Sequence, residues 1–193
     1  MIDMAILVII GIIFAVLIVL FLLMLIGYYN RFTVLLNRID NSFAQIDVQL
    51  KKRADLIPNL MESVKGYMKH EAQIMKEVSD ARAALVSANK SGDLTKRLKA
   101  DNALEGSLGR LFAIAENYPN LKANENFLQF QNELSSMEDK IAYARQHYND
   151  SILSYNDSCK TFPGVVFAKI FGKKPGNWLS IPEVERITPK VKF

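Results

Sequence analysis

The sequence predicts an all-α protein with an N-terminal transmembrane helix, an antiparallel bundle of long helices and an irregular C-terminal tail. Three observations support this prediction. Residues 4–27 contain no charged side chain. Over residues 28–160, apolar side chains recur at alternating intervals of three and four, which places them on one face of a helix. The same region lacks the alternation of apolar and polar residues that is typical of strands.

Residues 4–27 are expected to cross a membrane. The stretch Met4–Ile26 has 23 residues, and as a helix it would be about 35 Å long, more than the roughly 30 Å hydrocarbon core of a bilayer. A cleaved signal peptide would need basic residues, a shorter apolar stretch and a small-residue cleavage site. Here only Asp3 precedes the stretch as a charged residue. A buried helix of a soluble protein is the other alternative. We predict a flank over residues 1–3 and a retained span over residues 4–27.

The residues after the span predict its surroundings and its orientation. Tyr28 and Tyr29 suit the headgroup layer, and Arg31 marks the return to water. Basic residues near the membrane lie behind the span and not ahead of it, which favours a cytoplasmic bundle. We therefore predict a single-pass protein of the cell membrane with its N-terminus outside.

The bundle over residues 28–160 is expected to contain four helices. The first continues from the span along an apolar face from Phe32 to Leu50. Pro58 should end it, because proline lacks the backbone N–H of a helix interior, and Asp55 could cap a second helix. If Pro58 only kinks a longer helix, the bundle has three helices. The later boundaries are predicted at the turn 89–92, at Asp93 and Asn124 as caps, and at 118–120 as a stop.

Residues 161–193 form a basic tail with an apolar patch. Residues 160–193 carry 7 Lys/Arg and 2 Asp/Glu, whereas residues 28–159 carry 17 of each. The neutral bundle argues against a nucleic-acid partner. An antiparallel topology would return Cys159 to the bilayer, so the segment 162–174 either lies in the membrane interface or caps the bundle core. The expected interface residues in it are Phe167, Lys169, Phe171, Lys173 and Lys174.

No catalytic, cofactor-binding or metal-binding residues are predicted. The two histidines, His70 and His147, lack the Glu-x-x-His spacing of a di-metal helical bundle. Cys159 occupies an apolar-face position and is expected to be buried and unreactive. A hydrolase that uses Glu71, His70 and His147 is a remote alternative.

Some polar residues stand in unexpected places. Glu71 falls on the apolar face predicted for the second helix, where a half-buried acid needs a partner. The string Tyr148-Asn149-Asp150 recurs seven residues later as Tyr155-Asn156-Asp157, on the same side of a helix. This repeat could be a polar layer that fixes helix register or a docking ladder for another chain.

Several strings resemble the LemA family of bacterial and archaeal membrane proteins. They include Gln45–Leu60, Glu116–Asn124, Ala144-Arg145, the two Tyr-Asn pairs, Phe162-Pro163 and Pro189–Phe193. The resemblance implies N-terminally anchored helical bundles without established catalysis. A magnetosome-associated member suggests a role in membrane organisation.

The strings 51–55 and 118–124 should then be exposed at turns, which makes Tyr118, Asn120, Lys122 and Asn124 candidate interaction residues. We predict a non-catalytic scaffold that self-associates on a lipid bilayer. The alternative is a tethered adaptor that docks an unidentified signalling or protease partner.

Overall fold

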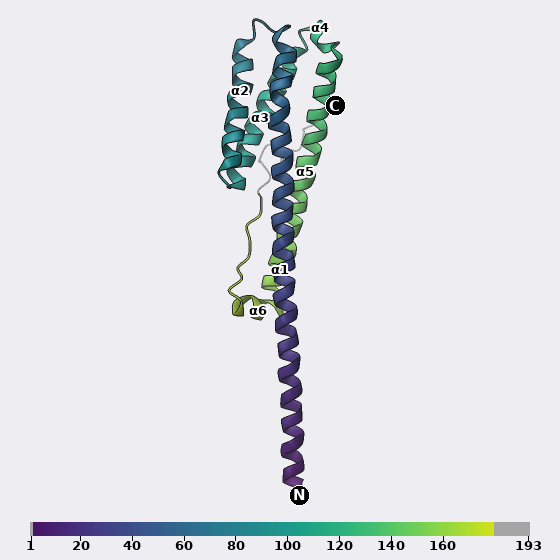
Figure 1. Ribbon diagram of the computed structural model, residues 1–193, viewed down its shortest axis with the longest axis vertical. Helices are drawn as coiled ribbons and strands as arrows, with labels where there is room; N and C mark the ends of the chain where they lie inside the picture. Colours follow the sequence, from purple (N-terminus) through teal and green to yellow (C-terminus); the bar gives the residue numbers. More distant parts are fainter. Residues whose placement is uncertain (1, 180–193) are drawn as a thin grey trace, which may run out of the picture. The chain divides into compact units, whose positions relative to one another are not determined.

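The computed structural model describes residues 2–179, which contain six helices and no strand (Figure 1). They are α1 (Ile2–Lys65), α2 (Ala72–Lys90), α3 (Leu94–Ala115), α4 (Pro119–Lys122), α5 (Glu125–Lys160) and α6 (Gly164–Ile170). The predicted all-α class is confirmed. Two compact units can be described separately. Unit 1 holds the described residues up to Asp40 and from Asn149 onward, and unit 2 holds Asn41–Tyr148. The tail segment predicted around Pro182 and Pro189 lies outside the described residues.

Pro58 neither ends nor restarts a helix, so the predicted boundary at Asp55 is wrong. It lies inside α1, which runs unbroken to Lys65. A proline at this position cannot donate the usual hydrogen bond to the carbonyl of Ala54, four residues earlier. The guanidinium Nε of Arg82 in α2 donates to that oxygen instead, at 2.9 Å. The helix therefore tolerates Pro58 because a side chain from a neighbouring helix satisfies the orphaned acceptor.

The first break in the chain comes at residues 66–71. Gly66 directly follows α1, and the backbone N–H groups of Tyr67 and Met68 both donate to the carbonyl of Val64. Val64 and Met68 are buried on either side of the break, so the turn is fastened to the core. Unit 2 still contains four long helical segments, as the prediction required, but His70 and Glu71 lie in a connection rather than in mid-helix.

The remaining boundaries follow the predicted capping chemistry. The Asp93 carboxylate accepts from the backbone N–H groups of Thr95 and Lys96, which begins α3. The Asn124 side-chain oxygen accepts from the N–H of Phe127 at 3.1 Å and begins α5. Pro119 occupies the first turn of α4, where its missing N–H costs nothing. Local side-chain chemistry thus sets three of the helix starts.

The core of unit 2 is a continuous apolar cluster. α2 and α3 pack side by side (Figure 1), and the cluster receives side chains from α1 through α5. Its fully buried members are Ile57, Leu60, Val64, Val78, Leu85, Leu104, Leu111 and Leu121. These positions continue the spacing of three and four seen in the sequence, so the predicted apolar faces meet in one core.

Unit 1 is built from α1, the end of α5 and α6. Its buried cluster joins Phe32 and Leu35 of α1, Tyr155 and Cys159 of α5, and Phe167 of α6. Gly164 opens α6 in close contact with α5, because a Cβ at this position would stand 2.2 Å from the carbonyl oxygen of Ser158. α6 ends at Ile170, and Gly172, just beyond it, has the positive φ of 64° that suits a glycine following a helix C-terminus. The predicted burial of Cys159 is confirmed.

Candidate functional site

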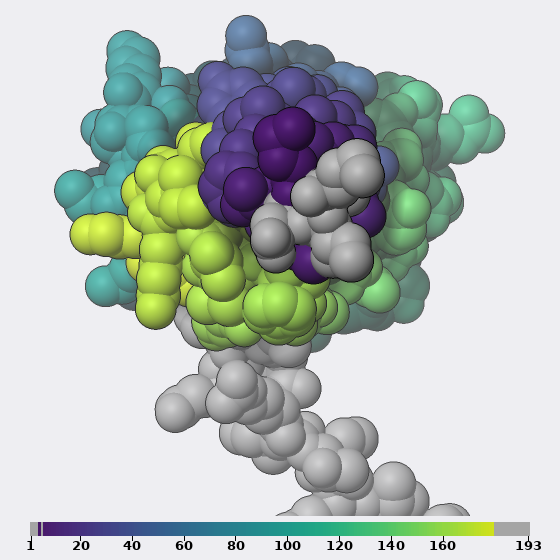
Figure 2. Space-filling view, turned by 90° about the horizontal axis from the view of Figure 1, so that it is seen from below, coloured from purple at the N-terminus to yellow at the C-terminus, as the bar shows by residue number. Residues whose placement is uncertain are grey.

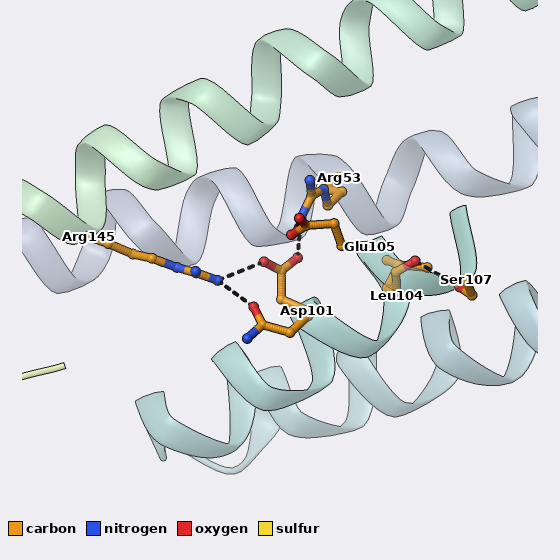
Figure 3. Close-up of polar contacts among 7 residues, drawn as sticks. Arg53, Asp101, Leu104, Glu105, Ser107 and Arg145 are labelled. Atoms are coloured by element: carbon orange, nitrogen blue, oxygen red, sulfur yellow. Dashed lines mark hydrogen bonds and ion pairs between the residues drawn. The ribbon is translucent and has the colours of Figure 1, made fainter. Parts of the chain in front are cut away.

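A layer of charged side chains lies inside unit 2 (Figure 3). The Asp101 carboxylate of α3 has no exposed surface, and it accepts from Arg53 of α1 at 2.9 Å and from Arg145 of α5 at 3.2 Å. Arg145 also donates to the side-chain oxygen of Asn102. Glu105 stands 3.6 Å from Arg53. Three helices are therefore joined by one buried anion, an arrangement suited to fixing helix register rather than to chemistry.

The charge around Glu105 is unbalanced. Burial is the main cause that raises the pKa of this carboxyl above its ordinary value of 4.5. Arg53 opposes the rise, while the neighbouring acids Glu138 and Asp101 add to it. The Glu105 carboxyl thus keeps its proton to higher pH than a free glutamic acid, although it is partly open to solvent.

A second ion pair flanks this layer. Arg97 of α3 is buried, and its Nη1 donates to the Asp47 carboxylate of α1. The same guanidinium lies 5.1 Å from the ring centroid of Phe43, within the range of a cation–π contact. Arg53, which was predicted to be exposed at a turn, is instead 2% exposed within α1.

Three of the predicted interaction residues gather at one end of unit 2. Tyr118 donates to the Glu71 carboxylate at 3.0 Å, and Asn124 donates to the hydroxyl of Tyr67 at 3.3 Å. The hydrogen bond to Glu71 is the main cause that raises the pKa of Tyr118. Glu71 therefore has the partner that its half-buried position requires. The bonds tie the 66–71 connection to the α4 turn.

The other two candidates in this region are on the surface of that turn. Asn120 and Lys122 are exposed. Lys122 forms an ion pair with Glu116. The turn thus presents polar side chains to solvent, while hydrogen bonds of Tyr118 and Asn124 attach it to the 66–71 connection.

The repeated asparagines hold the chain's own C-terminal segment. Asn156 accepts from the N–H of Gly176 at 2.7 Å and donates to its carbonyl at 3.0 Å. Asn149 makes the same pair of bonds to Leu179, at 2.9 and 3.2 Å. Seven helical residues span about 10 Å, which equals the reach of three extended residues. We call Asn149 and Asn156 the asparagine ladder.

The other members of the two repeated strings differ in position. Tyr155 is buried, its ring edge-on to Phe32 with centroids 6.3 Å apart. Burial, with a hydrogen bond to Cys159, raises the pKa of Tyr155 to about 12. Burial likewise raises the pKa of the Cys159 thiol. Asp150 is exposed, and Tyr148 is half-buried.

Aromatic side chains join α6 to the end of the predicted span. The rings of Tyr28 and Phe167 stack at 4.7 Å, and Phe21 lies 5.9 Å from Phe167. Tyr29 meets the edge of Phe171 at 5.5 Å. Figure 2 shows α6 beside the N-terminal stretch of α1. Of the remaining predicted interface residues, Arg31, Lys169 and Lys174 are exposed and Lys173 is half-buried.

The outer side of α6 is also apolar. Phe162 is 84%, Val166 44% and Ile170 52% exposed. Val166 and Ile170, four residues apart, lie along one side of the helix, and Phe162 precedes its first residue. The large apolar side chains of the span, from Met4 to Ile26, are mostly exposed as well and belong to the same unit.

The histidines do not form a joint site with Glu71. His147 Nδ1 lies 2.8 Å from the hydroxyl of the buried Ser42, and His70 is exposed on the 66–71 connection. Among the described residues, no group of three His, Cys, Asp or Glu side chains is placed to hold a metal ion.

The sequence analysis missed the charged layer, although a signal for it was present. Arg97 and Asp101 fall on the spacing 94, 97, 101, 104, 108, 111 that defines the buried face of α3. Arg53 does the same between Leu50 and Ile57. A heptad face that stays in phase only when charged residues are included indicates a buried polar layer.

These features define a class before any relative is considered. Within residues 2–179, one helix is long and apolar enough to cross a membrane, and its most apolar window is entirely exposed. A packed helical unit follows along the same chain. The protein is a membrane-associated helical protein.

Comparison with known proteins assigns the family. Residues 42–193 match the model of the LemA family, and the chain belongs to that family. It is 30% identical over 126 residues to Protein LemA of Metamycoplasma hominis, covering 65% of this chain and 57% of that protein.

Two further relatives carry the name of a magnetosome protein. Magnetosome protein MamQ of Magnetospirillum gryphiswaldense is 26% identical over 177 residues, covering 80% of this chain and 65% of the relative. Magnetosome protein MamQ 2 of Paramagnetospirillum magneticum is 26% identical over 180 residues, covering 81% and 66%. The chain thus matches less than two thirds of the length of these relatives.

Proposed function

We propose that the protein is a non-catalytic, membrane-anchored scaffold whose copies associate in the plane of the bilayer. The observation that carries the proposal is the unbroken helix α1. It includes the span and also supplies Ile57, Leu60 and Val64 to the core of unit 2. An anchor that is itself a core helix is suited to holding a folded unit at a membrane.

The apolar surface of unit 1 supports the lipid part of this proposal. The exposed side chains of Phe162, Val166 and Ile170 add to the exposed apolar surface of unit 1, and Lys169, Lys173 and Lys174 provide positive charge on the same segment. Apolar side chains flanked by lysines are typical of a helix lying in the interface. We infer that the exposed side of α6 rests among lipid headgroups. Phe167, which was predicted to lie in the membrane interface, is instead buried in the core of unit 1, so residues 162–174 also cap that core.

Self-association follows from geometry and concentration. Parallel anchors confine copies to two dimensions, so weak contacts between helices suffice. A shallow surface hollow of about 580 Å³ lies along α5, lined by Leu128, Met137 and polar side chains between them. Leu128 is exposed there. We propose this hollow as the contact between copies.

Energy transfer between labelled full-length copies in lipid vesicles tests the scaffold. We expect transfer that persists when lipid is added and falls when unlabelled protein is added. Leu128→Glu should weaken it, while Ala142→Glu, exposed on the same helix outside the hollow, should not. Transfer equal to that of randomly distributed copies would rule out self-association.

Orientation is part of the same proposal, with the N-terminus outside and the bundle in the cytoplasm. It rests on the basic residues behind the span. Protease added to sealed, right-side-out vesicles should leave the exposed 118–124 turn intact. Cleavage there without permeabilisation would reverse the orientation.

A tethered adaptor is the second candidate function. The observation that favours it is the α4 turn, where bonds from Tyr118 to Glu71 and from Asn124 to Tyr67 hold an exposed Asn120 in place. A docked partner would be lost with Asn120→Asp, whereas Asn37→Asp, exposed on α1 and outside both described hollows, would serve as the control. Equal binding by both variants would exclude this turn as the docking site.

A further inference from the structure

We propose that unit 1 contains a binding site for an anionic phospholipid headgroup, of the phosphoglycerol class, in a groove between α1 and α5. The groove has a volume of about 620 Å³, within the range of small-molecule sites. Its α1 wall carries Asn30, Arg31 and Arg38, and its α5 wall carries Ser154 and Asp157. This inference rests on the membrane anchoring proposed above and adds a specific ligand to it.

The position of the groove along α1 places it near the lipid headgroups. Gly27, the last residue of the apolar stretch, lines the groove. Arg31 follows four residues later, about 6 Å further along the helix axis. A bilayer of roughly 40–45 Å with a 30 Å hydrocarbon core leaves a headgroup layer of about 5–8 Å on each side. With the span centred near residue 15, the Arg31 backbone lies about 24 Å from the bilayer midplane, at the outer edge of the headgroup layer, and its long side chain can reach back to the lipid phosphates.

The arginines supply the recognition of phosphate. Arg31 is exposed, and within residues 2–179 its side chain has no ion pair or hydrogen bond. A guanidinium presents donors in a planar fork that matches a phosphate. Arg38 lines the groove about 10 Å further along α1 and has an interaction of its own within the described residues. Arg31 is thus the phosphate contact, and Arg38 adds positive charge to the groove.

The opposite wall selects the kind of headgroup. Ser154 and Asp157 present oxygen atoms that can accept hydrogen bonds from hydroxyl groups. Two arginines and one aspartate give the groove a charge of +1, which matches a lipid of charge −1. A zwitterionic lipid would leave that charge unbalanced. The phosphate would face Arg31, and the glycerol hydroxyls of the headgroup would face Asp157.

The apolar part of the groove favours a lipid over a free phosphate ester. Val34 and Leu35 line it together with Gly27, and it borders the exposed apolar surface of the span. A free phosphate ester would gain nothing from this continuity, whereas a lipid places its acyl chains beside the span and its headgroup in the groove.

Native mass spectrometry of the full-length protein, released from nanodiscs of equal phosphatidylglycerol and phosphatidylcholine, tests the proposal. We expect phosphatidylglycerol to be retained in preference. Arg31→Gln should lower its retention about tenfold, the loss of one charge-assisted hydrogen bond, and Arg38→Gln should lower it less. Lys52→Gln, exposed in unit 2, should change nothing. Circular dichroism and the fluorescence of Trp178 would show that each variant is folded.

The outcomes separate this inference from the proposed function. Equal retention of both lipids, or wild-type retention by Arg31→Gln, would overturn the site while leaving the anchor intact. Displacement of phosphatidylglycerol by millimolar glycerol phosphate would assign the groove to a soluble phosphate ester and overturn the lipid proposal. A protein that does not enter the nanodisc would overturn the anchoring itself.

Discussion

Replacing Arg82 by methionine should destabilise unit 2 only because Pro58 is present. The Arg82 Nε bond to the Ala54 carbonyl takes the place of the helical bond that Pro58 cannot make. Ala54 is 1% exposed, so its carbonyl would have no water to replace the lost donor. A hydrogen bond from a charged donor to a buried acceptor is worth about 1.5–3 kcal/mol, and we expect Arg82→Met to cost that amount.

The double variant gives the decisive comparison. In Pro58→Ala the residue 58 N–H can donate to Ala54, so the arginine is no longer needed there. Arg82→Met should then cost less than about 1 kcal/mol, the amount expected for its remaining surface contacts. Urea unfolding in mild detergent, followed by circular dichroism, measures all four free energies. An equal loss in both backgrounds would refute the reasoning.

Four other perturbations follow from the described contacts. Asp101→Asn should cost about 3–5 kcal/mol in urea unfolding, because it leaves two arginines without their buried anion; a loss below about 1 kcal/mol would contradict a structural role. Replacing both ladder asparagines by alanine should release the segment that carries Trp178, seen as a red shift of its fluorescence and faster proteolysis there, while the circular dichroism of the helices is unchanged. A raised pKa in the folded state means that the folded protein binds more protons. Because folding raises the pKa of Glu105, the free energy of unfolding of unit 2 should decrease as the pH rises above 4.5. Glu105→Gln should remove this decrease. Folding also raises the pKa of Tyr155, so the free energy of unfolding of unit 1 should decrease between pH 10 and about 12. Tyr155→Phe should remove this decrease.

Local chemistry explains which helix boundaries could be predicted from the sequence. Asp93 and Asn124 cap helices through bonds to backbone groups two or three residues away, so the sequence contains both partners. The predicted boundary at Pro58 was wrong because the carbonyl that Pro58 leaves without its helical donor is bonded by Arg82, 24 positions later in the sequence. A proline rule that considers only the local backbone cannot include a donor from another helix.

The candidate sites show the same division. The recurrence of Tyr-Asn at seven residues identified Asn149 and Asn156 as unusual, and a docking ladder for another chain was one of its two interpretations, but the two asparagines bind this chain itself. The occupant, the chain's own segment 176–179, could not be predicted because it carries no complementary pattern: its backbone makes the bonds. The charged layer at Asp101 was missed because charged residues were assumed to be exposed, although the helical spacing places Arg97 and Asp101 on the buried face of α3.

The asparagine ladder has a consequence for how this family can vary. Because each amide bonds only to main-chain atoms, the side chains between the two rungs can mutate without loss of attachment, and Asn177 and Trp178 are accordingly exposed. Gly176 is the exception, since a Cβ there would stand 3.0 Å from Ile152 Cδ1. Substitutions at positions 177 and 178 should therefore leave the attachment intact, whereas either asparagine of α5 should not be replaceable without loss of its pair of bonds.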